Sequence, residues 1–104
     1  MSNYNKNISV VIPVYNSKTT LVELCDRLNT VLPGISKEYE IILVNDGSKD
    51  TSGNVINQIS KNCESVKGVH LMRNYGQHNA LLCGIRIAKY ELIVTLDDDL
   101  QNPP

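Results

Sequence analysis

The chain has 104 residues, of which 41% are hydrophobic and 20% charged, with a formal net charge of -1; this is the composition of one small globular domain. The near-neutral charge gives no electrostatic reason to expect nucleic-acid binding. No apolar run approaches the roughly 20 residues of a membrane-spanning helix, and the N-terminus lacks the hydrophobic stretch of a signal peptide, so we expect a cytoplasmic location.

The first strand is predicted over residues 8–13, which are mostly β-branched. A helix follows, because Thr20 and Glu23 have the spacing of a capping box and apolar residues then recur every three or four positions up to residue 32. The dipeptide Pro33-Gly34 is expected to end this helix.

A second buried strand is predicted over residues 39–44, followed by a polar turn. Asp50 or Thr51 could cap the next helix, in which Val55, Ile59 and Cys63 recur every four residues. The three cysteines have no C-x-x-C spacing, and we expect them to be reduced and to pack as small hydrophobic residues. They are Cys25, Cys63 and Cys83.

The second half predicts a weaker strand over residues 69–72 and a final strand over residues 92–96. Between them lies a segment that is apolar on almost every side. We therefore expect a buried helix there, with Ala80, Gly84 and Ala88 as a stripe for close packing.

Strands alternating with helices predict an α/β fold: a three-layer, Rossmann-like arrangement with a mainly parallel sheet and helices on both faces. The continuous apolar strands agree, because parallel sheets are buried on both sides. Ligands bind outside the carboxyl ends of such strands. Unusual polar clusters follow all the predicted strands, so all should lie on one edge: residues 13–16, 46–48, 73–78 and 97–99.

The last of these clusters consists of Asp97, Asp98 and Asp99. Adjacent carboxylates repel one another unless a cation neutralises them. Oxygen ligands suit a hard divalent cation, so we predict a metal site here. A solvated acidic turn is the alternative interpretation.

The sequence contains neither G-x-G-x-x-G nor G-x-x-x-x-G-K-[ST], which argues against a dinucleotide site and a phosphate-binding P-loop. A nucleoside diphosphate held through a cation fits the clusters better. Asp46 can accept a hydrogen bond from the base, and Tyr15 offers a ring for stacking. Taken alone, the turn at residues 45–48 is better explained by a structural role than by a functional one.

These clusters, in this order, resemble those of family 2 glycosyltransferases of the glycosyltransferase-A fold. The Asn-Tyr-Gly-Gln run at residues 74–77 and the Asp-Leu-Gln-Asn-Pro-Pro run at residues 99–104 are most similar to the polyprenyl-phosphate branch. That branch includes dolichol-phosphate mannose synthases and undecaprenyl-phosphate sugar transferases. The resemblance extends from about residue 8 to the end of the chain.

The resemblance implies a role for each matching residue. Catalysis and the binding of Mg²⁺ or Mn²⁺ would depend on Asp97 and Asp99, with Gln101 as a further metal ligand. The nucleotide sugar would be bound by residues from every cluster: Pro13, Val14, Tyr15, Asn16, Val44, Asp46, Arg73, Gln77 and Asp98. Two positions depart from the family pattern, because Ser17 stands where an acidic residue is common and Asn45 where Asp is often found.

The activity implied is metal-assisted sugar transfer, with inversion, from a nucleotide sugar to an acceptor. A UDP-sugar is the favoured donor and GDP-mannose the second, and polyprenyl phosphate is the favoured acceptor. Residues 1–104 would be the N-terminal donor-binding part of a longer domain, truncated just after the Asp-x-Asp motif. We expect this part to bind donor without turnover and to self-associate through uncovered apolar surface. The longer protein would sit on the cytoplasmic face of the membrane.

Three alternatives stay open at this point. One is a soluble glycosyltransferase acting on a polysaccharide or cell-wall glycan. Another is a non-catalytic nucleotide-binding module. The third is an unrelated flavodoxin-like or receiver-type domain that holds Mg²⁺, although such a domain predicts acidic residues where Pro13-Val14-Tyr15-Asn16 stands.

Overall fold

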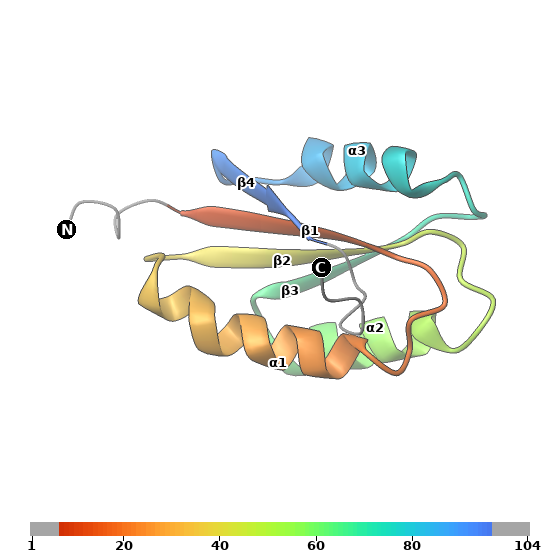
Figure 1. Ribbon diagram of the computed structural model, residues 1–104, viewed down its shortest axis with the longest axis horizontal. Coiled ribbons are helices and arrows are strands. Elements are labelled where there is room, and N and C mark those ends of the chain that lie inside the picture. The colour runs from red at the N-terminus through yellow and green to blue at the C-terminus, as the bar shows by residue number, and fades with distance from the viewer. Residues whose placement is uncertain (1–6, 97–104) are drawn as a thin grey trace, which may run out of the picture.

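The computed structural model describes residues 7–96. Its centre is a four-stranded sheet of order β3-β2-β1-β4, in which every neighbouring pair is parallel (Figure 1). The strands are β1 (Ile8–Val14), β2 (Tyr39–Asn45), β3 (Val66–His70) and β4 (Leu92–Thr95). The predicted α/β fold with a parallel sheet is confirmed.

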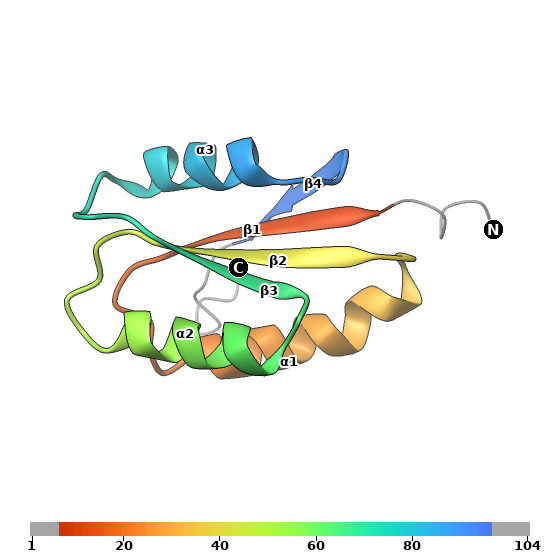
Figure 2. The ribbon, with the colours of Figure 1, turned by 180° about the vertical axis from the view of Figure 1, so that it is seen from behind.

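Helices cover both faces of this sheet. They are α1 (Leu21–Val31), which continues into a short 3₁₀ turn η2 (Leu32–Gly34), then α2 (Ser52–Asn62) and α3 (Gln77–Ile87). Figures 1 and 2 show α1 and α2 together on one face and α3 alone on the other. Within residues 7–96, no helix is long and apolar enough to cross a bilayer.

Each face has its own hydrophobic core. The larger core packs alternate residues of β1 and β2 against α1 and α2, with Leu21 and Ile56 fully buried in it. The smaller core packs Val11, Ile42 and Val44 against Ala80 of α3. This alternation explains why β1 and β2 are apolar throughout, since both of their faces are covered.

The close packing predicted for α3 is present on one side of the helix only. A Cβ added at Gly84 would lie 2.4 Å from Cγ1 of Val11, so only glycine allows this approach. The opposite side of α3 is open, however, with Leu82 42% and Ile85 37% exposed. The prediction of a helix buried all round is therefore wrong, because in the described part of the chain α3 has the sheet on one side and nothing on the other.

Strand β4 is also less covered than the sequence predicts. Leu92 is 42% and Val94 38% exposed, because within residues 7–96 β4 is an edge strand that pairs with β1 alone. The third strand begins at Val66 instead of residue 69 and ends at His70. Its bounds follow from its pairing with β2. This pairing includes Lys67 and Gly68, which do not belong to an apolar run.

The predicted helix starts are correct in position, and a bond to one of the predicted capping side chains forms at α2 but not at α1. Thr20 makes no side-chain cap bond, and Glu23 pairs with Arg27 at 2.6 Å, so the predicted capping box does not form. At α2 the side chain of Asp50 accepts the N–H of Ser52 at 2.9 Å. The three cysteines are free, and only Cys25 is fully buried.

A buried carboxylate near the amino ends of the strands was not predicted. Glu40 accepts hydrogen bonds from the Ser9 hydroxyl at 2.6 Å and the Lys89 N–H at 2.8 Å, and pairs with Lys67 at 2.8 Å. Burial alone would raise the pKa of Glu40, but the bonds from Lys67, Ser9 and Lys89 outweigh it and lower the pKa below its usual value. This cluster ties the connection between α3 and β4 to the sheet.

Candidate functional site

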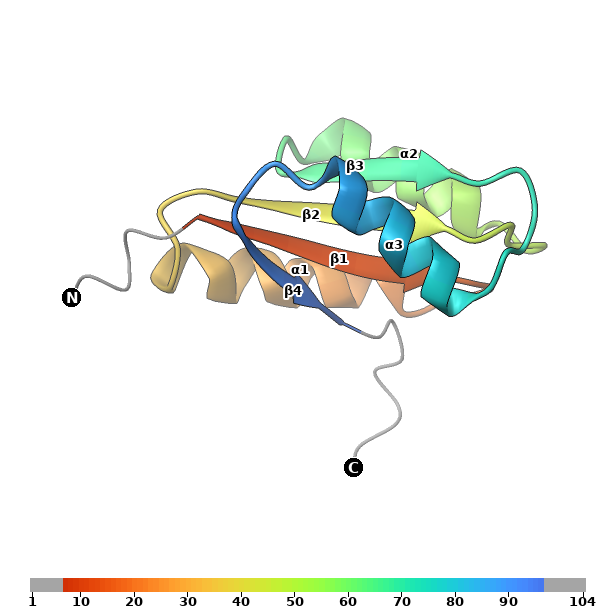
Figure 3. The same ribbon diagram turned by 90° about the horizontal axis from the view of Figure 1, so that it is seen from above.

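The strand order predicts a ligand site at the carboxyl ends of β1 and β4. From β1 the chain moves through α1 to β2 on one side, whereas α3 carries it back across the sheet to β4 on the other side (Figure 3). Where the connections from two neighbouring parallel strands lead to opposite sides in this way, ligands commonly bind outside the carboxyl ends of those strands. The chain leaves β4 at Leu96, whose N–H bonds the carbonyl of Val11 at 3.1 Å. Asp97, Asp98, Asp99 and Gln101 lie outside the described residues.

The loops after β1, β2 and β3 meet at this edge, at the right of the sheet in Figure 1. Their proximity is confirmed by hydrogen bonds between residues far apart in sequence. The N–H of Asn16 bonds Ser48 Oγ at 3.0 Å, and the N–H of Ser17 bonds Ser52 Oγ at 2.9 Å. The sequence prediction of one shared edge therefore holds for the first three strands.

The β1 loop turns at Asn16, whose φ of 53° lies in the left-handed region that Asn tolerates better than most residues. Its side-chain oxygen accepts the N–H of Lys49 at 2.8 Å. Asn16 thus joins two loops, and its predicted contact with the nucleotide stays a prediction. The neighbouring Tyr15 is 40% exposed, so its ring is available for stacking.

Pro13, Val14 and Val44 are buried within their strands. Pro13 lies beyond the residues of β1 that pair with β4, where its missing N–H removes no ladder bond. Val14 and Val44 belong to the two cores, so in this arrangement they could contact a ligand only through the main chain.

Asp46 organises the loop that follows β3. It is 2% exposed, and its two oxygens accept the N–H groups of Tyr75 at 2.8 Å and Gly76 at 3.1 Å. Charge-assisted bonds of this kind are stronger than neutral ones. Each carboxylate oxygen has a second lone pair, so these bonds leave acceptor capacity, and the predicted contact of Asp46 with a base stays a prediction.

Gly47 brings the second and third loops into main-chain contact. Its φ is 70°, and an added Cβ would lie 2.4 Å from the carbonyl carbon of Arg73 and 2.4 Å from the N of Asn74. Only glycine fits here. Arg73 itself is exposed and stacks on Tyr75, with its guanidinium carbon 5.2 Å from the ring centre. Gln77 is exposed at the first position of α3.

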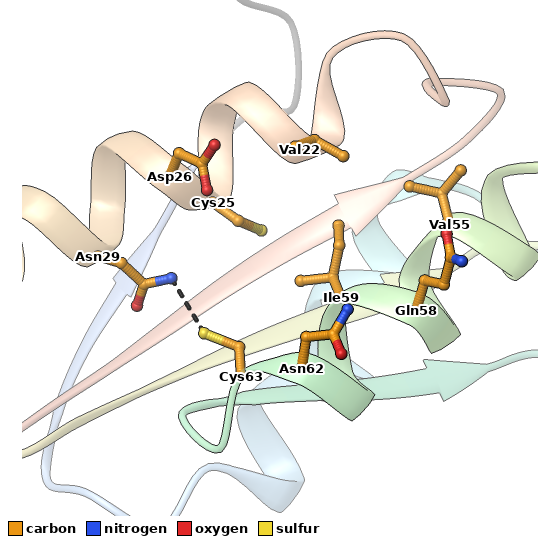
Figure 4. Close-up of a pocket in the computed structure, with 9 residues that line it drawn as sticks. All are labelled: Val22, Cys25, Asp26, Asn29, Val55, Gln58, Ile59, Asn62 and Cys63. Atoms are coloured by element: carbon orange, nitrogen blue, oxygen red, sulfur yellow. Dashed lines mark hydrogen bonds between the residues drawn. The ribbon is translucent and has the colours of Figure 1, made fainter.

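Residues 7–96 contain no group of three or more metal-ligating side chains. A hollow of about 290 Å³ does lie between α1 and α2 (Figure 4), lined by residues that include Cys25, Asp26 and Cys63. None of its lining residues is a Lys or Arg, so it has no counter-charge for a diphosphate. The carboxyl edge is the better candidate, because Arg73 lies there and the loops converge there.

Comparison with known proteins settles the family. The sequence profile described as Glycosyl transferase family 2 matches residues 9–104. The chain belongs to this family. The receiver-type alternative is thereby excluded.

This family 2 chain is 47% identical over 105 residues to the undecaprenyl-phosphate 4-deoxy-4-formamido-L-arabinose transferase of Shewanella sediminis (strain HAW-EB3). That alignment covers 97% of the chain and 32% of the relative. The chain thus spans about a third of the length of this relative.

Solved structures with the same fold include S. aureus TarS 1–349 in complex with UDP-GlcNAc, at 25% identity and a TM-score of 0.77, covering 89% of this chain and 26% of that one. The mannosyltransferase PcManGT of Pyrobaculum calidifontis, in complex with GDP-Man and Mn²⁺, gives a TM-score of 0.81 at 22% identity, covering 92% of this chain and 28% of that one. The expected glycosyltransferase-A arrangement is confirmed.

Several residues that shape the site were not singled out as functional from the sequence. Ser48, Ser52 and His70 join the loops or the strand ends. The turn sequence at residues 45–48 could have identified Ser48. No sequence pattern identifies His70, because its partners come from β2 and α2.

Proposed function

We propose that the complete protein transfers a sugar from a nucleotide sugar to polyprenyl phosphate, with inversion at the anomeric carbon. The supporting observation is the convergence of three motif-bearing loops on the carboxyl edge, through Asn16–Ser48 and Asp46–Tyr75 bonds. Family membership and the undecaprenyl-phosphate transferase relative support sugar transfer and this acceptor. A UDP-sugar is the favoured donor, since TarS binds UDP-GlcNAc and UDP; GDP-mannose is second.

In this proposal the described loops bind the nucleotide. The exposed ring of Tyr15 stacks on the base, whose polar edge donates to Asp46. Arg73 supplies positive charge to the diphosphate, and Gln77 bonds it from the start of α3, where the first N–H groups of a helix favour an anion.

The divalent ion would be held by Asp97 and Asp99, with Gln101 as a third ligand. Carboxylate and amide oxygens are the donors that Mg²⁺ and Mn²⁺ prefer, so the chemistry of this set fits the proposed ion. Such an ion, when bound, neutralises charge on the departing nucleoside diphosphate.

The transfer itself is one displacement. A phosphate oxygen of the acceptor forms a bond to the anomeric carbon as the bond from that carbon to the nucleoside diphosphate breaks. Attack from the opposite side inverts the configuration. Because the acceptor phosphate is already anionic at neutral pH, the site needs little help from a general base.

The 104-residue chain is proposed to bind donor without turnover. It spans 32% of the length of the undecaprenyl-phosphate transferase relative, and we propose that the acceptor site is formed largely by the part of the protein that corresponds to the rest of that relative. A location on the cytoplasmic face of the membrane is likewise a proposal.

Calorimetry tests the donor site directly. We expect the chain to bind UDP in the presence of Mn²⁺, and Asp99→Asn to weaken that binding at least tenfold, about 1.4 kcal/mol. Asp26→Asn, on the exposed side of α1, is the matched control and should bind like the wild type. Equal weakening by both variants, or no binding of UDP or GDP by the wild type, would contradict the proposal.

A further inference from the structure

His70 is the last residue of β3, and its imidazole connects two elements. Its Nδ1 lies 3.1 Å from Nδ2 of Asn45, and its Nε2 lies 2.9 Å from Oδ1 of Asn57 on α2. His70 and Asn45 are also register partners in the sheet. The ring therefore bridges the end of β2 and helix α2.

The direction of these bonds follows from one fixed donor. The main-chain N–H of Ser48 can only donate, and it lies 2.9 Å from the Oδ1 of Asn45. The other end of the Asn45 amide is then its NH₂ group, which donates to His70. Nδ1 of His70 must accept, so it carries no proton. The remaining nitrogen, Nε2, carries the hydrogen and donates to Asn57.

The chain of bonds continues into the site. Ser48 Oγ accepts the N–H of Asn16, and the Asn16 side chain accepts the N–H of Lys49. The amide of Asn45 thus links the imidazole of His70 to the loops after β1 and β2. Turning that amide over would place NH₂ against the N–H of Ser48 and break the link.

The fit around the Asn45–His70 pair is close. A Cβ added at Gly53 of α2 would lie 3.1 Å from Nδ2 of Asn45 and 3.8 Å from Nδ1 of His70. The absence of a side chain at Gly53 leaves the room that the pair occupies.

We propose that His70 is a positioning residue for the nucleotide pocket. As a neutral ring protonated on Nε2, it holds the Asn45 amide in one orientation and so fixes the loop from Asp46 to Ser48. The expected effect of His70 on nucleotide affinity rests on the proposed function, whereas the hydrogen-bond pattern around the ring is independent of it.

Nitrogen-15 NMR of the ring tests the bond pattern without any ligand. We expect His70 to show a protonated Nε2 and a bare Nδ1. In Asn45→Asp the carboxylate can only accept, so Nδ1 should become protonated. A wild-type ring protonated on Nδ1 would overturn the proposal.

Two substitutions separate positioning from packing. In His70→Asn the new Oδ1 takes the place of Nδ1 and keeps an acceptor facing Asn45. In His70→Gln the new Nε2 takes the place of the ring Nε2 and keeps only the donor to Asn57. We expect hydrogen exchange at the N–H of Ser48 to speed up roughly three- to tenfold in His70→Gln and less than about twofold in His70→Asn.

The affinity for UDP with Mn²⁺ should follow the same order, with Gln58→Asn as the control because Gln58 is an exposed residue of α2 that has no place in the proposed pocket. Equal exchange rates in the two His70 variants would overturn the positioning role. Absence of UDP binding by the wild type would instead defeat the proposed function, while ring NMR and Ser48 exchange still decide the role of His70.

Discussion

The amino ends and the carboxyl ends of the strands, called here the amino edge and the carboxyl edge, each bury a carboxylate. The two carboxylates have different kinds of hydrogen-bond and ion-pair partners. At the amino edge Glu40 faces a cation, Lys67, together with the hydroxyl of Ser9. At the carboxyl edge Asp46 receives only main-chain N–H groups, and the ion pairs that residues 7–96 form are those of Glu23 with Arg27 and Lys67 with Glu40.

This difference indicates that the two edges have different roles. In the cluster around Glu40 the carboxylate is paired with Lys67, and its bond from the Lys89 N–H anchors the α3–β4 connection. The carboxyl edge is held by loops that bond one another, and among residues 7–96 Asp46 forms no ion pair. Such an edge is ordered in shape while it keeps acceptor capacity for a ligand. The following substitutions test this contrast.

The largest effect is expected from Gly47→Ala at the carboxyl edge. The new Cβ would meet the main chain of Arg73 and Asn74, which cannot move aside, at a positive φ that disfavours alanine. We expect about 3 kcal/mol of lost stability, measured by urea unfolding. Gly34→Ala, at the end of η2, is the matched control, since its Cβ would meet nothing within 4 Å and should change stability by less than about 1 kcal/mol. Similar losses in both variants would disprove the contact between the loops.

Glu40→Gln should destabilise the fold and leave the nucleotide site intact. Loss of the charge removes the pairing with Lys67, which is half exposed, so we expect about 2 kcal/mol of lost stability. UDP affinity should stay within about twofold of the wild type. A marked loss of affinity in this variant would mean that the two edges are coupled.

Asp46→Asn makes the same chemical change at the other edge. One of the N–H groups of Tyr75 and Gly76 would then face an NH₂ group, which costs about 1–2 kcal/mol of stability. Unlike Glu40→Gln, this variant should weaken UDP binding by roughly tenfold or more, measured by calorimetry. Unchanged affinity would remove Asp46 from the proposed pocket.

The acid dependence of stability should report on Glu40. Its folded pKa is lowered, so its contribution is fully present above the unfolded pKa of about 4.3 and is lost as the pH falls through the lower folded value. Urea unfolding from pH 6 to pH 3 should show this loss in the wild type and less of it in Glu40→Gln. Parallel pH curves would contradict the assignment.

The smallest effect concerns Cys25, which lines the hollow between α1 and α2. Burial, with smaller effects of Cys63 and Asp26, raises its pKa to about 11. Alkylation of Cys25 in the folded chain should therefore be slow at pH 8 and speed up toward pH 11, because the thiolate is the reactive form. Mass spectrometry of labelled peptides measures this, with the less buried Cys83 as the internal reference.

Much of the fold followed from local pattern. The apolar runs of β1 and β2 and the spacing of α1 were sufficient to predict a parallel sheet with helices, because burial on both faces leaves a continuous apolar strand. The turn residues after each strand also predicted that polar groups would share one edge. The sequence by itself therefore determined the class of fold and the meeting of the loops after the first three strands at one edge.

Tertiary structure alone decided how that edge is held. The partners of Asp46 lie on a loop about thirty residues away, and those of His70 lie on β2 and α2; no periodicity encodes such bonds. The exposure of α3 and β4 was missed for the same reason, because an apolar sequence shows that a surface needs covering but not whether a neighbour is there to cover it. Strand order and register bring distant side chains together, and only three-dimensional packing fixes both.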